Sequence, residues 1–218
     1  MADRDLTIAD IGEFPFIHSI EEGSTFAPRR LVRGIGDDCA VIGPCDGKVL
    51  LATTDLLVED VHFRLAWTSP EDLGEKAVAV NLSDIAAMGG EALHILVSIA
   101  VPGSMSLSVL KGLYKGIKAI SKRYRVNIVG GDTVRSEEGL FIGITALGEA
   151  SEEEVLYRSG AAAGDRIYVT GTLGDAAAGL RVLEGDYTVP EPVAAALKRA
   201  HRLPVPCLEE GRLIAGSR

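Results

Sequence analysis

The clearest hydrophobic pattern in the sequence lies at residues 76–90, KAVAVNLSDIAAMGG, where apolar side chains fall on nearly every face of a helix. This pattern is typical of a buried helix and not of one lying on a surface. Ser69 and Pro70 supply a helix start, and Gly89 and Gly90 supply a stop. The sequence therefore predicts a central buried helix with well-marked ends.

Two polar residues, Asn81 and Asp84, interrupt this apolar helix. They are three positions apart, so they share one helical face and offer two oxygen donors there. A lone buried carboxylate would cost on the order of several kcal/mol, so Asp84 should be protonated, paired or bound to a cation. An aspartate that caps a neighbouring loop is the alternative, and this helix alone does not decide between them.

The rest of the first 148 residues mixes helical and extended patterns. Helical spacing is found at 8–20 and 104–124. Six stretches have the composition of strands: 39–42, 48–52, 56–63, 92–101, 126–129 and 139–147. Glycine-rich turns are expected at 34–36, 43–47 and 130–133. This order predicts an α/β fold of the α+β type, with a mixed or antiparallel sheet flanked by helices.

A polar, acidic stretch at 149–158, EASEEEVLYR, indicates a domain boundary. We expect one domain over 1–148 and a second over 149–218. The second region has one predicted strand, 166–170, and three predicted helices, 175–183, 190–201 and 206–215. One strand is too few for an independent α/β domain, so the expectation is a partial domain in a C-terminally truncated chain.

Composition narrows the class of protein. The chain has 31 acidic and 22 basic residues, a net charge of −9 and no Lys/Arg cluster, which argues against a nucleic-acid-binding surface. The longest uncharged apolar run, near 96–101, is too short to cross a bilayer, and the N-terminus lacks the features of a secretory signal. Cys39, Cys45 and Cys207 have no metal-ligand spacing. A cytoplasmic protein with reduced thiols and no membrane partner is predicted.

Several acidic residues lie where a Gly- or Thr-containing turn meets an apolar element. Acidic residues that only solvate the surface are not expected at such positions. They are Asp37 and Asp38 in GIGDD, Asp55 in TTD, Asp84 in NLSD and Asp132 in GGDT. Gathered carboxylates repel one another unless cations lie between them, and hard oxygen ligands select Mg²⁺. Thr53 and Thr54 could add hydroxyl or carbonyl oxygens. The pattern predicts a magnesium site that takes a phosphate-bearing substrate.

The phosphate-binding elements are less specific. Glycine-rich segments occur at 34–36, 130–131 and 171–174, but neither a Walker motif nor GxGxxG is present. Arg158 could hold a phosphate, or could form a surface salt bridge with the acidic run 152–154. Tyr114 could stack on a base, or could be half-buried core.

Five motifs together resemble the thiamine-monophosphate kinase family, within the aminoimidazole-ribonucleotide-synthetase-like superfamily. They are GIGDDCAVI, TTDLLVEDVHF, KAVAVNLSDIAAMGG, IVGGDTVRS and YRSGAAAGDRIYVTGTLGDAAAGL. The resemblance implies ATP- and Mg²⁺-dependent phosphorylation of thiamine monophosphate to thiamine diphosphate. It also implies a homodimer whose N-terminal domains share a barrel-like β interface.

The resemblance also implies roles for single residues. The implied metal ligands are Asp38, Thr53, Thr54, Asp55, Asp84 and Asp132. The implied ATP contacts are Tyr114, Gly131, Asp132 and Arg158, and His62 is the implied contact to the thiamine phosphate. Val134 replaces the second Thr of the usual GGDTTRS pattern, and the DxSDG segment that the family carries further on does not occur before the last residue. Since the motifs supply no obvious nucleophile, direct in-line phosphoryl transfer is predicted.

Two alternatives within the superfamily lack their signatures. Selenophosphate synthetase should show a reactive Cys or selenocysteine with a Lys near the N-terminus, and a hydrogenase-maturation carbamoyl dehydratase should show a C-terminal Cys; neither is present. A noncatalytic Mg-nucleotide-binding dimerisation module remains open as an alternative from another class.

Overall fold

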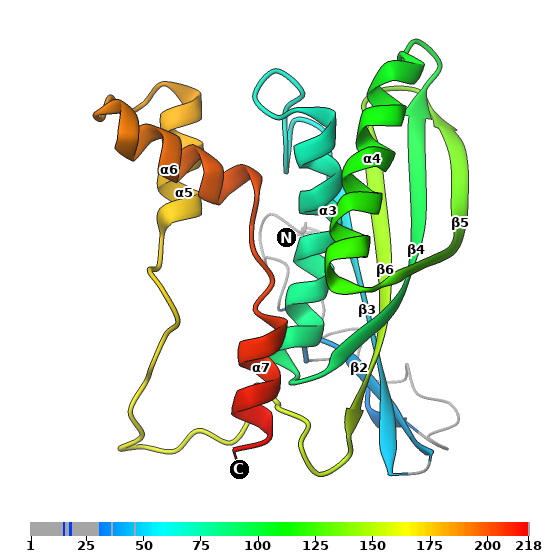
Figure 1. The fold of residues 1–218 in the computed structure, drawn as a ribbon, viewed down its shortest axis with the longest axis vertical. Coiled ribbons are helices and arrows are strands. Elements are labelled where there is room, and N and C mark those ends of the chain that lie inside the picture. Colours follow the sequence, from blue (N-terminus) through cyan, green and yellow to red (C-terminus); the bar gives the residue numbers. More distant parts are fainter. Residues whose placement is uncertain (1–14, 16–17, 19–30, 36, 46, 218) are drawn as a thin grey trace, which may run out of the picture.

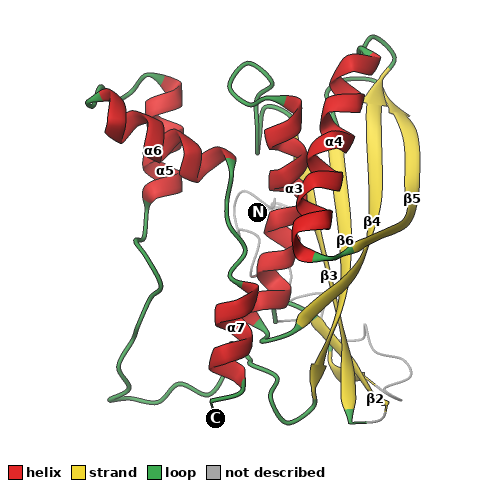
Figure 2. Ribbon diagram, in the orientation of Figure 1, coloured by secondary structure: helices red, strands yellow, loops and turns green. Residues whose placement is uncertain are grey.

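The computed structural model describes residues 15, 18, 31–35, 37–45 and 47–217. Within these ranges the chain forms a mixed sheet with helices packed on it (Figures 1 and 2). The elements are β1 (Leu31–Arg33), β2 (Ala40–Cys45), β3 (Lys48–Val58), α3 (Pro70–Ala87), β4 (Glu91–Pro102), α4 (Leu107–Tyr124), β5 (Asn127–Ser136), β6 (Phe141–Ser151), α5 (Asp175–Glu184), α6 (Glu191–Arg202) and α7 (Leu208–Ala215). No described helix is both long and apolar enough to span a membrane. The predicted helix at 8–20 lies almost wholly outside the described residues.

The sheet has the order β1-β2-β3-β6-β4-β5. Its neighbours are antiparallel except β4 and β5, which run parallel and are joined by α4 as a crossover. β3 and β6 pair without a break from Lys48↔Ser151 to Val58↔Phe141. The prediction of a mixed sheet is therefore confirmed.

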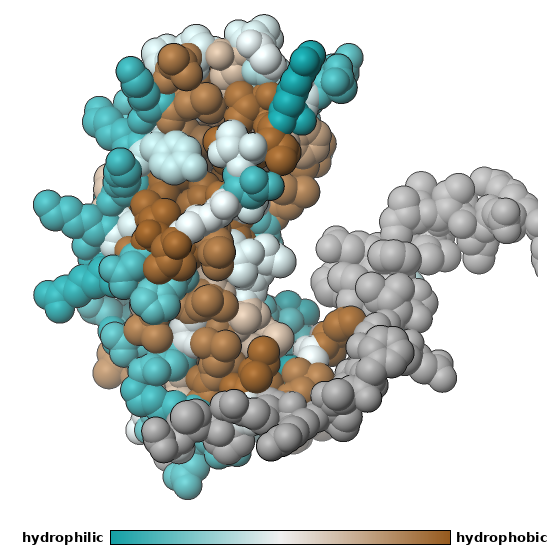
Figure 3. Space-filling model, turned by 90° about the vertical axis from the view of Figure 1, so that its right-hand side faces the viewer, coloured by the Kyte–Doolittle hydropathy of each residue, from teal (hydrophilic) through white to brown (hydrophobic). Residues whose placement is uncertain are grey.

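The helices α3 and α4 cover one face of this sheet, which we call the inner face (Figure 2). Side chains on the inner face and on α3 form the hydrophobic core. Its fully buried members include Leu51, Ile95, Ile142 and Ile144 from the strands and Leu73, Leu82 and Ile85 from α3. No described helix covers the opposite, outer face, and Figure 3 shows hydrophobic residues gathered on that side of the molecule.

The central helix α3 has the ends that the sequence predicts. The Ser69 hydroxyl accepts a hydrogen bond from the Asp72 amide at 3.1 Å, and Pro70 is the first helical residue. Beyond the last turn Gly89 adopts φ 72°, the left-handed conformation that favours glycine. α3 packs closely on α4 because Gly116 has no side chain: a Cβ there would overlap the Glu71 carbonyl.

Three strand predictions are wrong in extent. β3 and β5 extend because pairing with a neighbouring strand continues past the predicted end, whereas β2 carries an irregularity between Ile42 and Cys45. β2 continues through Gly43 and Pro44, where a turn was expected. β3 runs on to Val58, so 56–63 is not a separate strand, and 59–63 forms a turn in which Asp60 has φ 63°. β5 passes straight through 130–133, because every residue there pairs with β4.

The chain after β6 is less regular. α7 packs on α3, while α5 and α6 pack mainly on each other (Figure 1). The strand predicted at 166–170 does not form: Ile167, Tyr168 and Val169 are 94%, 81% and 55% exposed. A strand needs a hydrogen-bonding neighbour, and no described strand lies beside this segment.

Candidate metal and nucleotide site

Four of the predicted metal ligands lie near one another around β3 and α3. Thr53 and Asp55 are two positions apart on β3, so both side chains lie on the inner face, toward the helix that carries Asp84. The Thr53 hydroxyl donates to Asp84 Oδ2 at 2.7 Å. Asp38, just before β2, lies within electrostatic range of Asp84. We call Asp38, Asp55 and Asp84 the acidic cluster.

Burial and mutual repulsion make it costly for the carboxyl groups of the acidic cluster to be charged at the same time. Burial, then the nearby Asp55 and Asp38 carboxylates, raise the pKa of Asp84 to about 6, against the opposing effects of the Thr53 hydrogen bond and of Arg158. Burial also raises the pKa of Asp55. Asp84 is half-buried and not fully buried as predicted. A cation placed here would relieve the repulsion between the carboxylates.

Arg158 supplies positive charge to the cluster from the segment after β6. Its Nε donates to Asp38 Oδ1 at 3.0 Å, its Nη2 bonds the same oxygen, and its backbone amide donates to Asp37 Oδ1 at 3.2 Å. The alternative of a salt bridge to 152–154 is therefore wrong. Asp37 Oδ2 is buried and accepts no hydrogen bond from the described residues, although Arg33 Nε lies 3.5 Å away.

The Thr54 hydroxyl is not brought to the acidic cluster. Successive side chains of a strand point to opposite faces, so Thr54 lies on the outer face of the sheet. There its hydroxyl donates to the Ile144 carbonyl at 3.0 Å and lies 3.1 Å from the Thr145 hydroxyl.

Three of the residues assigned to ATP meet at the other edge of the sheet. A cavity of about 280 Å³ is lined by Tyr114, Gly131 and Asp132, together with Val97, Gly130 and Thr133. Gly131 is required there, because a Cβ would overlap the Val97 carbonyl. Tyr114 also packs against the core and is half-buried, as the alternative to base stacking predicted. We call this cavity the β5 pocket.

The β5 pocket and the acidic cluster are separate within one chain. Asp132 pairs with Ser98, Ser98 with Gly143, and Gly143 with Leu56, the neighbour of Asp55. Three strand spacings place Asp132 about 14 Å from β3. Arg158, bound to Asp38, is therefore also remote from Gly131 and Asp132. Among the described residues no three His, Cys, Asp or Glu side chains converge closely enough to hold a metal ion.

His62 lies in the turn after β3, near Asp55 of the acidic cluster. Its Nδ1 accepts a hydrogen bond from the Val58 amide at 3.0 Å. The ring is close enough to Asp55 to oppose the rise in the pKa of that carboxyl. His62 also borders a cavity of about 70 Å³ whose other wall includes Leu180 and His201, from α5 and α6.

Residues 36–150 match a family model described as the AIR synthase related protein, N-terminal domain. The chain belongs to this family. The match contains the acidic cluster, His62 and the β5 pocket, so the segments that build both parts of the site are those that define the domain. Arg158 lies outside the matched residues.

Family members with known names and structures resemble the chain over most of its length. It is 40% identical to the thiamine-monophosphate kinase of Bacillus subtilis (strain 168) over 212 residues, which is 92% of this chain and 62% of that protein. A structure described as AaThiL complexed with AMPPCP and TMP superposes with a TM-score of 0.85 at 34% identity, over 97% of this chain and 65% of that one. Thiamine monophosphate kinase from Aquifex aeolicus superposes with a TM-score of 0.79 at 31% identity, over 96% and 66%. The chain thus spans a little under two thirds of these relatives, and the resemblance to the thiamine-monophosphate kinases is confirmed.

The sequence did not indicate the contacts that two polar residues of α3 make in the structure. Asn81 was expected to offer an oxygen beside Asp84, but its Oδ1 accepts the Asp55 amide at 3.0 Å and its Nδ2 donates to the Ala77 carbonyl at 3.0 Å. Asn81 therefore connects α3 to β3 at Asp55, past Ala52, the last residue of β3 that pairs with β2. Lys76 stands at the start of the apolar motif in the sequence, and in the structure its Nζ donates to the His62 carbonyl at 2.9 Å. For Asn81 the available signal was a polar residue inside an apolar run; Lys76, which follows Glu75 at the start of that run, gave no such signal.

Proposed function

We propose that this chain takes part in the ATP-dependent phosphorylation of thiamine monophosphate to thiamine diphosphate, by direct in-line phosphoryl transfer. The observation that carries the proposal is the acidic cluster with His62 beside it, in a chain that is 40% identical to a thiamine-monophosphate kinase. The groups gathered here are carboxylates and the Thr53 hydroxyl, which donates to Asp84. The chemistry of these groups suits charge neutralisation and positioning, which dominate phosphoryl transfer.

The chemistry of the donors at the acidic cluster fits Mg²⁺, although the described side chains do not converge closely enough in this structure to hold the ion. The donors are carboxylate and hydroxyl oxygens, and burial, followed by the charges of Asp55 and Asp38, raises the pKa of Asp84. Asp38, Thr53, Asp55 and Asp84 would hold the metal here. When bound, Mg²⁺ would supply positive charge that offsets the charge on the transferred group.

ATP is proposed as the phosphoryl donor, with Tyr114, Gly131 and Asp132 of the β5 pocket as its contacts. The ring of Tyr114 borders the pocket, and backbone approach is possible at Gly131 because the residue has no Cβ. Arg158 would have to leave Asp38 to reach a phosphate group. A cation at the acidic cluster would favour that exchange, because it replaces the guanidinium as the partner of Asp38.

We propose a homodimer joined through the outer face of the sheet, which would bring outer-face residues of the two chains together. This face carries exposed apolar side chains, including Leu50 and Leu56 at 40% and 55% exposed. Figure 3 shows hydrophobic residues gathered on this side of the molecule. Paired residues share a face of the sheet, and Asp132 is linked through Ser98 and Gly143 to Leu56, two positions from Thr54. Thr54 and Asp132 therefore lie on the same face. We propose that they contribute to a metal site only across such an interface.

The proposed division of labour follows the chain. Residues 1–148 would form the Mg/ATP-binding and dimerisation domain of a cytoplasmic enzyme, and residues 149–218 part of a second domain. Arg158 and the walls formed by α5 and α6 would be the contributions of that second part to the site.

The test is transfer of label from γ-labelled ATP to thiamine monophosphate by this chain, with Asp84→Asn as the variant and Glu153→Gln, an exposed acid outside the site, as its matched control. Labelled thiamine diphosphate from the unaltered chain and from Glu153→Gln, but not from Asp84→Asn, would support the proposal. Mg-dependent binding of ATP without transfer would favour the noncatalytic module. Neither binding nor transfer would contradict both.

A further inference from the structure

One basic side chain, Lys76, faces the turn that carries His62. It is on α3, about two helical turns before Asp84. Its Nζ donates to the His62 carbonyl at 2.9 Å, and it forms no ion pair with any carboxylate in the described part of the chain. Lys76 is half-buried, and this burial lowers the pKa of its ammonium group.

A lysine in this setting is unusual for a purely structural role. An ammonium group has three donors and is costly to remove from water without an anionic partner. On the neighbouring helix Lys115 shows the ordinary arrangement, exposed and 3.4 Å from the Glu71 carboxylate. Lys76 instead donates to one backbone carbonyl, that of His62, whose ring is the proposed contact to the acceptor.

The turn that Lys76 holds also fixes the His62 ring. The Val58 carbonyl accepts the amides of Val61 and His62 at 3.2 and 2.9 Å, and the Val58 amide donates to His62 Nδ1 at 3.0 Å. We call residues 58–63 the His62 loop. Because Nδ1 accepts, a neutral ring carries its proton on Nε2. Nε2 is then the donor that remains for a ligand.

The place where Lys76 lies joins three elements. Lys76 on α3 is close enough to His201 on α6 to affect that imidazole electrostatically, and the cavity beside it is bounded by His62, Trp67 and His201. Arg202 Nη1 also donates to the Trp67 carbonyl at 3.2 Å, which ties the end of α6 to the segment that follows the His62 loop. Movement of the His62 loop would therefore open one wall of the cavity.

We propose that Lys76 is a positioning residue: through the His62 carbonyl it holds the His62 loop so that Nε2–H is presented to the phosphate monoester of the acceptor. This inference rests on the proposed function for the identity of the acceptor. The geometry of the loop itself does not depend on it.

The first test needs no ligand. Hydrogen exchange of the Val58 amide should become at least tenfold faster in Lys76→Met, because the loop that shields this amide loses its anchor. Lys115→Met, which removes an exposed lysine with one polar partner, is the matched control and should leave Val58 unchanged. Equal protection of Val58 in Lys76→Met and in the unaltered chain would overturn the proposal.

The second test separates an effect through His62 from a direct one. Lys76→Met should weaken the apparent affinity for thiamine monophosphate about tenfold and leave that for ATP unchanged, and Lys76→Arg, which keeps a donor, should restore most of the loss. In a His62→Ala background Lys76→Met should have no further effect. Independent, multiplying losses would overturn the proposal, and so would loss of folding in Lys76→Met if Lys76→Arg gave no rescue.

These outcomes distinguish the inference from the proposed function. If the unaltered chain binds no thiamine monophosphate, the proposed acceptor is wrong, and the exchange of the Val58 amide still decides whether Lys76 holds the His62 loop. If the acceptor binds and Val58 exchange does not respond to Lys76→Met, the proposed function stands and the role of Lys76 is wrong.

Discussion

Residues 37–151 and residues 152–217 differ in how completely their apolar side chains are covered. In the first region every strand from β2 to β6 has a partner, and Leu51, Leu82 and Ile144 are at most 1% exposed. In the second, Ile167 is 94% exposed and Leu173 81%. Both regions contain sequences rich in strand-forming residues. The comparison shows that such composition gives a strand only where another strand supplies hydrogen bonds.

The site reflects the same difference. The acidic cluster is held by β3, α3 and the segment before β2, which belong to the well-packed region. The second region adds Arg158 and one wall of the His62 cavity. A rigid frame for the carboxylates and a looser contribution from the second region are therefore expected.

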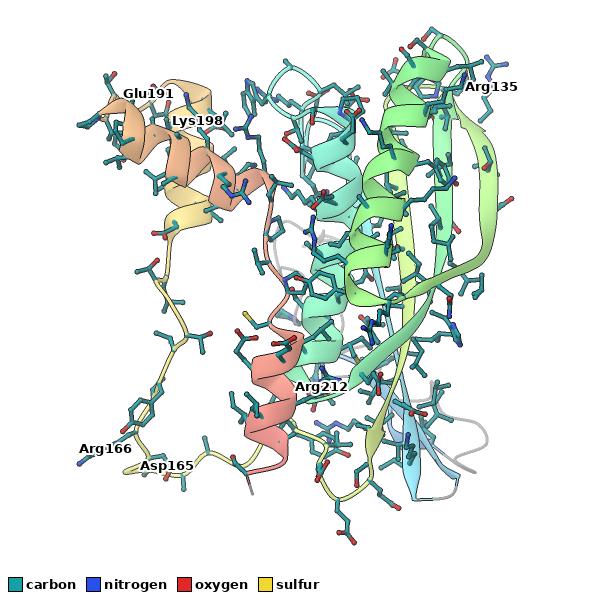
Figure 4. All side chains as sticks on the ribbon, in the orientation of Figure 1. Arg135, Asp165, Arg166, Glu191, Lys198 and Arg212 are labelled. Atoms are coloured by element: carbon teal, nitrogen blue, oxygen red, sulfur yellow. The ribbon has the colours of Figure 1, made fainter. Side chains whose placement is uncertain are left out.

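Limited proteolysis should show the largest contrast. Arg166 lies in the exposed segment and points away from the rest of the chain (Figure 4). Trypsin should cut after Arg166 at least about a hundredfold faster than after Arg123 in α4, because cleavage within a packed helix needs local unfolding. Mass spectrometry of early fragments measures this, with Arg166→Gln as the control that removes the site. A first cut within 70–151 would abolish the contrast.

Truncation of core side chains should give the next largest effect. Leu82→Ala should lower the free energy of unfolding by about 3 kcal/mol, because it empties a fully buried position on α3. Ile167→Ala should change it by less than about 0.5 kcal/mol, since this side chain is already in water. Urea unfolding measures both. Similar losses from the two substitutions would mean that the second region is as well packed as the first.

The change of the free energy of unfolding with pH should be the smallest effect, and Asp84 of the acidic cluster should be its source. The pKa of Asp84 is raised from 3.8 to about 6, so the folded state holds this proton more tightly than the unfolded state does. The stabilisation is complete below pH 3.8 and is lost as the pH rises through about 6. The full difference would correspond to about 3 kcal/mol, and solvent screening of this half-buried group reduces it to about 1–2 kcal/mol.

Urea unfolding between pH 4 and pH 7 without metal tests this prediction. Asp84→Asn should remove about 1–2 kcal/mol of the pH dependence, because it keeps the shape of the side chain and removes its titration. Glu153→Gln is the control and should follow the unaltered chain. Mg²⁺ should restore stability at pH 7 in the unaltered chain more than in Asp84→Asn. Parallel pH profiles for all three proteins would show that Asp84 does not carry the charge strain of the cluster.

Much of the fold could be predicted from local patterns. The start and end of α3, the long strand β4, and α5 to α7 to within a few residues all follow from caps and periodicity that span less than 20 residues. The residues with chemistry could be recognised too, because carboxylates beside apolar elements are rare without a function.

The sequence by itself determined which segments are helical and which side chains carry charge, because helix hydrogen bonds and caps are local. Tertiary structure alone decided the strand pairing. That pairing carries β5 through Gly130 and Gly131 and leaves 166–170 without a partner among the described strands. The pairing also decides which face of the sheet Thr53 and Thr54 each occupy. It also decided that Asp132 lies three strands from Asp55 and that Asn81 and Lys76 serve the backbone of β3 and of the His62 loop. Strand neighbours are chosen between residues as distant as Lys48 and Ser151, and no local pattern encodes such a choice.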